Sequence, residues 1–307
     1  MRRRITQAHL VLIVTFALYM GYQWMMQWIP VHNVMFHVMM GQVMLIFPSA
    51  MWMIGCYRKN KSQLTERMLF VPLSNANIKM AVAVIISAYP VVAILNSFSM
   101  YFVKNQVMTV MPYMMRMGLF PMLFSMAVMP ALNEELLFRG VMYGAYRQKS
   151  KKMGIFFSAL AFGLMHLNLN QMLYTVYLGI VLALMVEATG SLYTSMLMHF
   201  LLNGFNVVMS YMAAQMLAAE KIEGSQIQQA ADTTVQTFIG IPFQQLIIML
   251  VVLAIFLFFN GILIYSTFRM NKRNLQNEEG KGHILDLLIV IFIIITVIFT
   301  YMNTEFL

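Results

Sequence analysis

Charge is scarce in this chain. Only 10% of the 307 residues are charged and 61% are hydrophobic, with a mean hydropathy of +0.73. Soluble domains carry about 25% charged and about 45–50% apolar residues. The shortage of charge therefore excludes an ordinary soluble domain and indicates a polytopic membrane protein.

Cysteine is nearly absent as well. A single residue, Cys56, excludes an internal disulfide framework and a cysteine-based metal site. It lies near the end of an apolar run and has no neighbour in the sequence that suggests a catalytic partner. We therefore interpret Cys56 as a small packing residue.

Long apolar runs dominate the chain. A helix needs about 20 mainly apolar residues to cross a bilayer. The first run, residues 10–28, is too long for the apolar part of a cleavable signal peptide, so we expect a spanning helix there. Nine runs are long enough or nearly so, and they predict an all-α bundle of about eight or nine transmembrane helices: 8–28, 34–56, 78–103, 118–146, 153–168, 171–188, 191–212, 244–268 and 283–303.

Basic residues predict the orientation of this bundle. The chain has 20 Lys and Arg against 11 Asp and Glu. With the amino terminus in the cytoplasm, the nine runs place sixteen of the 20 basic residues on that side, as the positive-inside rule requires. The net charge of +9 is thus a topology signal and an attraction to anionic lipid. We expect membrane lipid as a partner, and no nucleic acid.

An acidic pair interrupts the run 118–146. Glu134 and Glu135 are followed by Arg139, and ionisable side chains within a membrane usually mark a functional site. Residues four apart share a helix face, so Glu135 and Arg139 are expected to pair. Glu134 is turned about 100° away and stays free for other work.

Two later runs carry polar residues at the same spacing. Phe162 and His166 share one helix face, and His199 and Asn203 share another. At about 1.5 Å per residue, Glu134, His166 and Asn203 all lie roughly 20 Å from the cytoplasmic helix ends, with His199 about one turn shallower. Three helices are therefore expected to converge on one polar cavity. Each residue alone also has a structural interpretation, as a core histidine, a buried ion pair or an asparagine between helices.

Other polar residues are assigned structural places. We interpret His37 as a bystander or a supporting group, and Glu187 as solvated at the cytoplasmic interface. The histidines at the ends of runs are expected at the interface, and two asparagines are expected to cap or line a tight turn: His9, His32 and His283, and Asn168 and Asn170.

The three motifs together resemble a known family. Glu134-Glu135-x-x-x-Arg139, Phe162-x-x-x-His166 and His199-x-x-x-Asn203 are similar, in this order, to the CAAX protease and bacteriocin-processing (CPBP/Abi) family of intramembrane proteases, which includes type II CAAX prenyl endopeptidases. The resemblance covers roughly residues 118–206. It implies an intramembrane endopeptidase that acts on membrane-associated proteins or peptides, from a cavity that faces the cytoplasmic side.

The resemblance also implies a role for each residue. Glu134 and His166 would activate a water molecule, and His199 and Asn203 would stabilise the oxyanion. Glu135, Arg139 and Phe162 would support the site. The apolar runs and this resemblance together divide the chain into four parts: about three N-terminal transmembrane helices in 1–117, a catalytic core in 118–212, a polar extracytoplasmic loop in 213–243 and two helices in 244–307.

A metal remains an alternative within this mechanism. Glu134, His166 and His199 would make a zinc set of two histidines and one glutamate with an open fourth position. The chain has no His-Glu-x-x-His motif, the helical zinc-protease arrangement. We favour the metal-free mechanism and keep zinc as the alternative.

Two other functions fit the same polar residues. The first is a non-catalytic immunity or scaffold protein that binds a peptide or partner in the same cavity. The second is a proton-coupled transporter that uses the glutamates and histidines as a relay. Such a transporter needs a path to both sides of the membrane.

Overall fold

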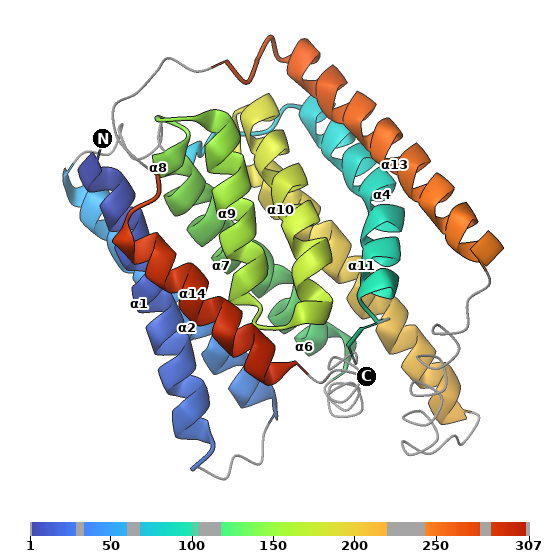
Figure 1. The fold of residues 1–307 in the computed structure, drawn as a ribbon, viewed down its shortest axis with the longest axis horizontal. Coiled ribbons are helices and arrows are strands. Elements are labelled where there is room, and N and C mark those ends of the chain that lie inside the picture. Colours follow the sequence, from blue (N-terminus) through green and yellow to red (C-terminus); the bar gives the residue numbers. More distant parts are fainter. Residues whose placement is uncertain are drawn as a thin grey trace.

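The computed structural model describes residues 2–28, 34–59, 68–100, 102–103, 118–219, 243–276 and 284–304. Its secondary-structure elements in these ranges are helices, which confirms the predicted all-α fold, and they lie side by side in one bundle (Figure 1). In chain order they are α1 (Arg2–Met26), α2 (Val34–Lys59), α4 (Asn75–Ser99), α6 (Leu119–Leu123), the π-helix η1 (Phe124–Val128), α7 (Met129–Glu135), the π-helix η2 (Leu136–Tyr143), α8 (Gly144–Tyr146), α9 (Lys151–Met165), α10 (Leu169–Thr189), α11 (Leu192–Ala219), α13 (Phe243–Met270) and α14 (Leu287–Asn303).

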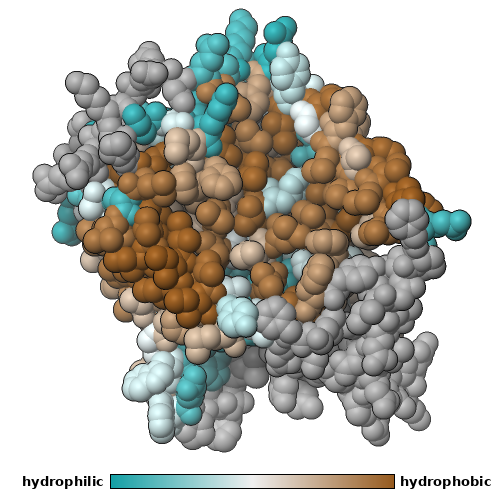
Figure 2. All heavy atoms as spheres, in the orientation of Figure 1, coloured by the Kyte–Doolittle hydropathy of each residue, from teal (hydrophilic) through white to brown (hydrophobic). Residues whose placement is uncertain are grey.

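Six helices of the described chain are long and apolar enough to cross a membrane, which confirms a multi-pass membrane protein. Figure 2 shows a broad apolar surface on the face of the bundle where α9, α10, α13 and α14 lie. The spanning segments are Arg4–Met26, Phe36–Cys56, Asn75–Ser99, Leu169–Thr189, Leu192–Ala213 and Gln244–Met270.

The other three predicted spans differ from simple helices. The run 118–146 is helical almost throughout, but it alternates between α-helix and π-helix. Helix α9 has only 15 residues and α14 only 17, so each is shorter than a full span. The expected count of eight or nine spans is therefore not confirmed. Residues 213–219, expected in the polar loop, continue α11, and residues 220–242 lie outside the described chain.

Helix α10 lies at the centre and packs on α9, α4, α11 and α13. It approaches α9 closely because Gly179 has no side chain. A Cβ there would lie 2.9 Å from the Ala159 Cα. Helix α13 is fastened by Asn260, which donates to the Ser87 hydroxyl at 2.7 Å and accepts from the Tyr177 hydroxyl at 3.3 Å. Helix α13, which follows the run of helices α9 to α11 in the chain, thus packs as part of the same bundle.

One end of the bundle collects the basic residues. The start of α1 meets the end of α8 there, where Arg4 donates to Gln148 at 2.8 Å, and the Lys151 ammonium donates to the Asn274 carbonyl at 3.0 Å (Figure 1). We call this the basic end. The basic residues expected on the opposite side, Lys104, Arg116 and Lys221, lie outside the described residues, so the orientation in the membrane stays a prediction.

The prediction that Glu187 is solvated is wrong. Its side chain is 1% exposed and accepts from the Tyr143 hydroxyl at 2.8 Å. Arg147 and Lys151 pair with it at 2.8 and 2.9 Å. These partners lie at the end of η2, in the connection before α9 and at the start of α9, some 40 residues earlier, and they make burial of the carboxylate tolerable.

His9 is also buried rather than interfacial. Its side chain is fully buried, and Nδ1 lies 2.8 Å from the Asp286 carboxylate, which also caps α14. This contact joins α1 to α14 across almost the whole sequence. His32 and His283 lie outside the described residues. The tight turn predicted at Asn168 is confirmed, because its side chain accepts from the Asn170 N–H at 2.9 Å.

Candidate active site

The three motifs meet in space. One cavity, about 250 Å³ in volume, lies between α7, the end of α9, and α11, and we call it the α11 cavity. Its lining includes Glu134, Phe162, His166, His199 and Asn203. The predicted convergence of three helices on one polar cavity is thus present in the structure.

Glu135 forms the buried centre of a charged cluster. Its Oε1 accepts from Arg139 Nη1 at 2.8 Å, and both side chains are 0% exposed. The pairing expected from their spacing is therefore present. The same oxygen lies 2.8 Å from His199 Nδ1. Arg139 also stacks over the Phe162 ring at 4.4 Å, a cation–π contact that links the cluster to α9.

Glu134 is held far more loosely than its neighbour. Its side chain is 16% exposed, and its Oε2 lies 3.8 Å from His199 Nε2. This separation is longer than a hydrogen bond. Glu134 therefore presents a carboxylate that His199 does not hold by a hydrogen bond and that a molecule in an adjoining cavity can reach.

The two histidines expose the same ring nitrogen. His166 Nδ1 lies 2.8 Å from the Phe162 carbonyl, and His199 Nδ1 lies 2.8 Å from the Glu135 carboxylate. Both partners are hydrogen-bond acceptors, so each Nδ1 carries the proton. The neutral form of each ring then has its lone pair on Nε2. The neighbours fix the tautomers in this way.

The Asn203 side chain is positioned by a hydrogen bond to a backbone carbonyl of the site helix, which a nearby proline leaves without its usual helical donor. Pro130 has no N–H, so it gives no helical hydrogen bond to the Met126 carbonyl four residues earlier. The Asn203 side chain donates to that carbonyl at 3.2 Å. Since an amide nitrogen has two N–H groups, one remains for a ligand in the α11 cavity.

The site helix contains two π-helical stretches that the sequence reasoning missed. Segment η1 carries Met126, and η2 carries Arg139. Such wide turns recur at functional sites, where they displace side chains from the regular helical phase. The sequence reasoning assumed 3.6 residues per turn throughout. The proline after η1 was the one available signal.

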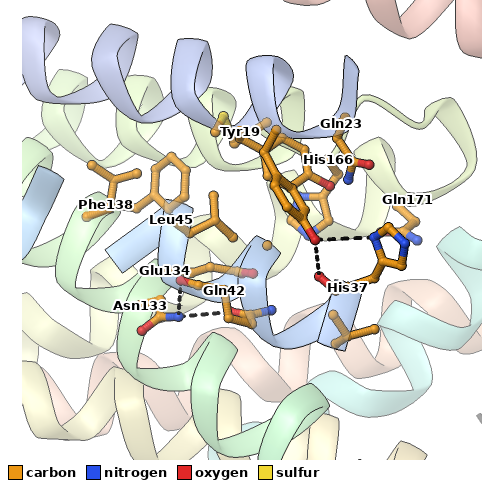
Figure 3. A pocket seen from close by; sticks show the side chains of 15 residues that line it. Tyr19, Gln23, His37, Gln42, Leu45, Asn133, Glu134, Phe138, His166 and Gln171 are labelled. Carbon is orange, nitrogen blue, oxygen red and sulfur yellow. Dashed lines mark hydrogen bonds between the residues drawn. The ribbon is translucent and has the colours of Figure 1, made fainter. Parts of the chain in front are cut away.

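A second cavity lies on the other side of Glu134, between α1, α2 and the site helix. It has a volume of about 380 Å³, and we call it the α1–α2 cavity (Figure 3). It shares Glu134, His166 and Gln171 with the α11 cavity. The polar residues that line only this side were missed or set aside at the sequence level: Tyr19, Tyr22, Gln23, His37, Gln42 and Asn133. The signal for them was polar side chains in apolar runs.

The proposed zinc set is not assembled. Within the described residues, no three His, Cys, Asp or Glu side chains lie close enough together to hold a metal ion. Glu134 and His199 are near each other. The Nδ1 atoms of His199 and His166 are engaged with Glu135 and a carbonyl, which leaves Nε2 of each ring able to bind a metal. It is the distances between the three side chains, and not the ring orientations, that do not fit a three-ligand site in this structure.

The position of the α1–α2 cavity conflicts with one expectation only if the basic end faces the cytoplasm, an orientation that stays a prediction. Its lining residues Gln23 and His37 lie near the end of α1 and the start of α2, and Gln171 lies in the first turn of α10. All three helix ends lie away from the basic end (Figure 1). A cytoplasmic basic end therefore places this cavity towards the extracytoplasmic side. The resemblance had implied a cavity facing the cytoplasm.

A comparison with protein families matches the part of the chain that builds this site. Residues 116–205 match the family model described as Type II CAAX prenyl endopeptidase Rce1-like. These residues are a domain of that family. No curated protein and no solved structure matches the chain significantly. The matched domain implies intramembrane protease activity, and it ends before α13 and α14 and begins after α1 and α2.

Proposed function

We propose that this chain is an intramembrane endopeptidase that hydrolyses peptide bonds of membrane-associated proteins or peptides at Glu134. The observation that carries the proposal is the contrast within the acidic pair. Glu135 is fully buried and paired, whereas Glu134 is partly exposed and lines both cavities. A carboxylate left free at a cavity in an apolar bundle is suited to act as a general base.

Glu134 and His166 together activate the attacking water. The Glu134 carboxylate takes one proton from the water, and the His166 Nε2 lone pair accepts a hydrogen bond from the other. The water oxygen then bonds to the substrate carbonyl carbon, and the carbonyl oxygen becomes an oxyanion. When the C–N bond breaks, Glu134 returns its proton to the leaving amine, as a general base that becomes a general acid does.

His199 and Asn203 stabilise the oxyanion. Because Nδ1 of His199 donates to Glu135, a second donor at Nε2 requires the doubly protonated ring, and the Glu135 carboxylate is the counter-ion for that form. The remaining N–H of Asn203 faces the same cavity. Preorganised donors aimed at developing negative charge commonly supply the largest single contribution to catalysis.

Glu135, Arg139 and Phe162 position these groups. Glu135 orients His199, Arg139 holds Glu135, and the Phe162 ring and carbonyl contact Arg139 and His166 respectively. None of the three needs to contact the substrate. Their function is to keep the His199 and His166 rings in the required tautomer and orientation.

Cleavage of a fluorescence-quenched peptide library by the purified chain in detergent tests the proposal. Glu134→Gln keeps the shape of the side chain but removes the base, so we expect a loss of about 10²–10⁴-fold in activity with unchanged accumulation in the membrane. Full activity of this variant would exclude Glu134 as the base, and absence of cleavage by the wild type would favour a binding or scaffold protein. A chelator arm separates the metal-free mechanism from a zinc-dependent one, because only the latter loses activity and recovers it with zinc.

A further inference from the structure

The wall that α1 and α2 contribute is not part of the matched family domain, yet it forms one side of the candidate site. Residues 116–205 carry Glu134, His166 and His199. The opposite wall of the α1–α2 cavity comes from residues before that range, among them Tyr19, Gln23 and Gln42. The match to the family domain therefore does not indicate which ligand this wall binds, and the residues of this chain have to.

The wall is polar but carries no positive charge. No lysine or arginine lines either cavity in the described part of the chain. The nearest arginine, Arg139, is fully buried against Glu135. A free carboxylate or a phosphate bound here would have no cation to pair with, and Glu134 would repel it. Anionic groups are therefore unsuited to the α1–α2 cavity.

The side chains of the wall are held ready to form hydrogen bonds. Asn133 is fully buried, and its amide donates to the Gln42 backbone carbonyl at 3.0 Å and to the Gln42 side-chain oxygen at 2.9 Å (Figure 3). This fixes the Gln42 amide and leaves its NH₂ group as a donor. The Tyr22 hydroxyl lies 3.2 Å from His37 Nδ1, which joins α1 to α2 across the cavity. Such support reduces the entropy lost when a ligand binds.

The neutral amide side chains of this wall are best matched to the main chain of an extended peptide. Each residue of an extended segment presents an N–H donor and a C=O acceptor that need partners when they leave water. Glutamine side chains offer both a donor and an acceptor. Gln23, Gln42 and Gln171 line the cavity from three helices and can serve several residues of one strand.

Resting on the proposed protease function, we propose that the α1–α2 cavity is a subsite for an uncharged, extended internal segment of the substrate, next to the scissile bond at Glu134. The enzyme then cuts within the substrate chain and does not bind the substrate's terminal carboxylate. Side chains on this side of the bond are neutral. The α11 cavity, lined by Met122, Met126 and Leu202, takes the apolar side.

Matched peptides test whether the enzyme needs a free terminal carboxylate on its substrate. One series carries a free terminal carboxylate and the other a terminal amide, at the same distances from the cleaved bond. We expect kcat/KM to agree within about twofold between the two series. A strict requirement for the free carboxylate would overturn the inference, because no lysine or arginine of the described residues lines the α1–α2 cavity to bind it.

Variants test the wall itself. Gln23→Leu and Gln42→Leu are expected to raise KM about threefold to tenfold with little change in kcat, because each removes a hydrogen bond that is made equally in the ground and transition states. Gln42→Leu also loses its contact with Asn133, so Gln23→Leu keeps the test valid if Gln42→Leu misfolds. Gln245→Leu, at an exposed position on α13, is the control. Wild-type kinetics in Gln23→Leu would overturn the inference.

Photo-crosslinking separates this inference from the protease proposal. A neutral peptide with a benzophenone side chain is irradiated with the Glu134→Gln protein, and the attachment site is mapped by mass spectrometry. Attachment to α1 or α2 that is weakened by Gln23→Leu supports the subsite even if the wild type cleaves no peptide, which would overturn the protease function alone. Attachment only elsewhere overturns the subsite.

Discussion

Two parts of the molecule place a glutamate near basic side chains, and they do so in different ways. At the basic end, Glu187 has three partners within 2.9 Å, from Tyr143, Arg147 and Lys151. In the middle of the bundle, Glu134 has its nearest basic group, His199, at 3.8 Å. Glu134 lines two cavities, and Glu187 lines neither of them.

The difference lies in how completely the charge is satisfied. A buried carboxylate with a full set of partners holds helices in register, and its burial is by itself weak support for a functional role. A carboxylate with incomplete partners at a cavity is a candidate for chemistry. The acidic pair repeats part of this contrast between adjacent residues. Within the described chain, one oxygen of Glu135 is paired with Arg139 and His199 at 2.8 Å, although its other oxygen is buried without a hydrogen-bond partner, whereas Glu134 has no contact with a basic group shorter than 3.8 Å.

The largest expected effect on folding stability comes from removing Arg139, the ion-pair partner of Glu135. Arg139→Leu leaves the Glu135 carboxylate fully buried with only His199 beside it, and such a change costs about 3–5 kcal/mol of folding stability. Thermal denaturation of the purified protein in detergent measures it. Arg58→Leu, an exposed change at the end of α2, is the control. Equal transition temperatures for the two variants would mean that the pair is not structural.

Asn203 tests the other side of this comparison, because it is proposed to act in catalysis rather than in folding. Asn203→Leu removes one proposed oxyanion donor, so we expect kcat to fall about 10²–10³-fold while KM changes little. Steady-state kinetics on a cleaved library peptide measures both constants. The variant also loses a contact with the Met126 carbonyl. A fall in transition temperature with unchanged kcat would assign Asn203 to helix packing alone.

The residues that the sequence predicted for the site, apart from Phe162, share one property: each is polar or ionisable in an apolar run, and lipid makes such residues energetically costly unless they have a function. Spacing along a helix then predicted the contact between Glu135 and Arg139, since both lie on one element. Contacts between distant elements had no such signal. Glu187 finds Arg147 on another segment, and His9 finds Asp286 277 residues away.

Parts of the fold were beyond sequence reasoning for similar reasons. The η1 turn carries the Met126 carbonyl, which accepts a hydrogen bond from Asn203, a residue of another helix that the local sequence does not reveal. The α1–α2 wall depends on how two N-terminal helices pack on α7 and η2. His37 looked like a bystander because only that packing brings it to the cavity.

A smaller effect is expected at the basic end. Glu187→Gln keeps an oxygen that can accept from Tyr143 but removes the charge that Arg147 and Lys151 face, so we expect a loss of about 1.5–3 kcal/mol in folding stability. The kcat/KM of the folded fraction should stay within about twofold of wild type. A large loss of kcat at unchanged stability would break the comparison, because Glu187 would then act on the reaction.

The last test changes neither stability nor chemistry and asks which side of the membrane each region faces. In a Cys56→Ser background, Gln23→Cys places a thiol in the α1–α2 cavity, and Arg58→Cys places one at the basic end. If basic residues set the orientation, a membrane-impermeant maleimide labels the first thiol in intact cells and the second only after lysis. The reverse pattern would put the cavity on the cytoplasmic side, as the resemblance implied, and the basic end outside. Labelling of both thiols from one side would contradict their placement at opposite ends of the bundle. Protection of the first thiol by a cleaved peptide would further tie that side to substrate binding.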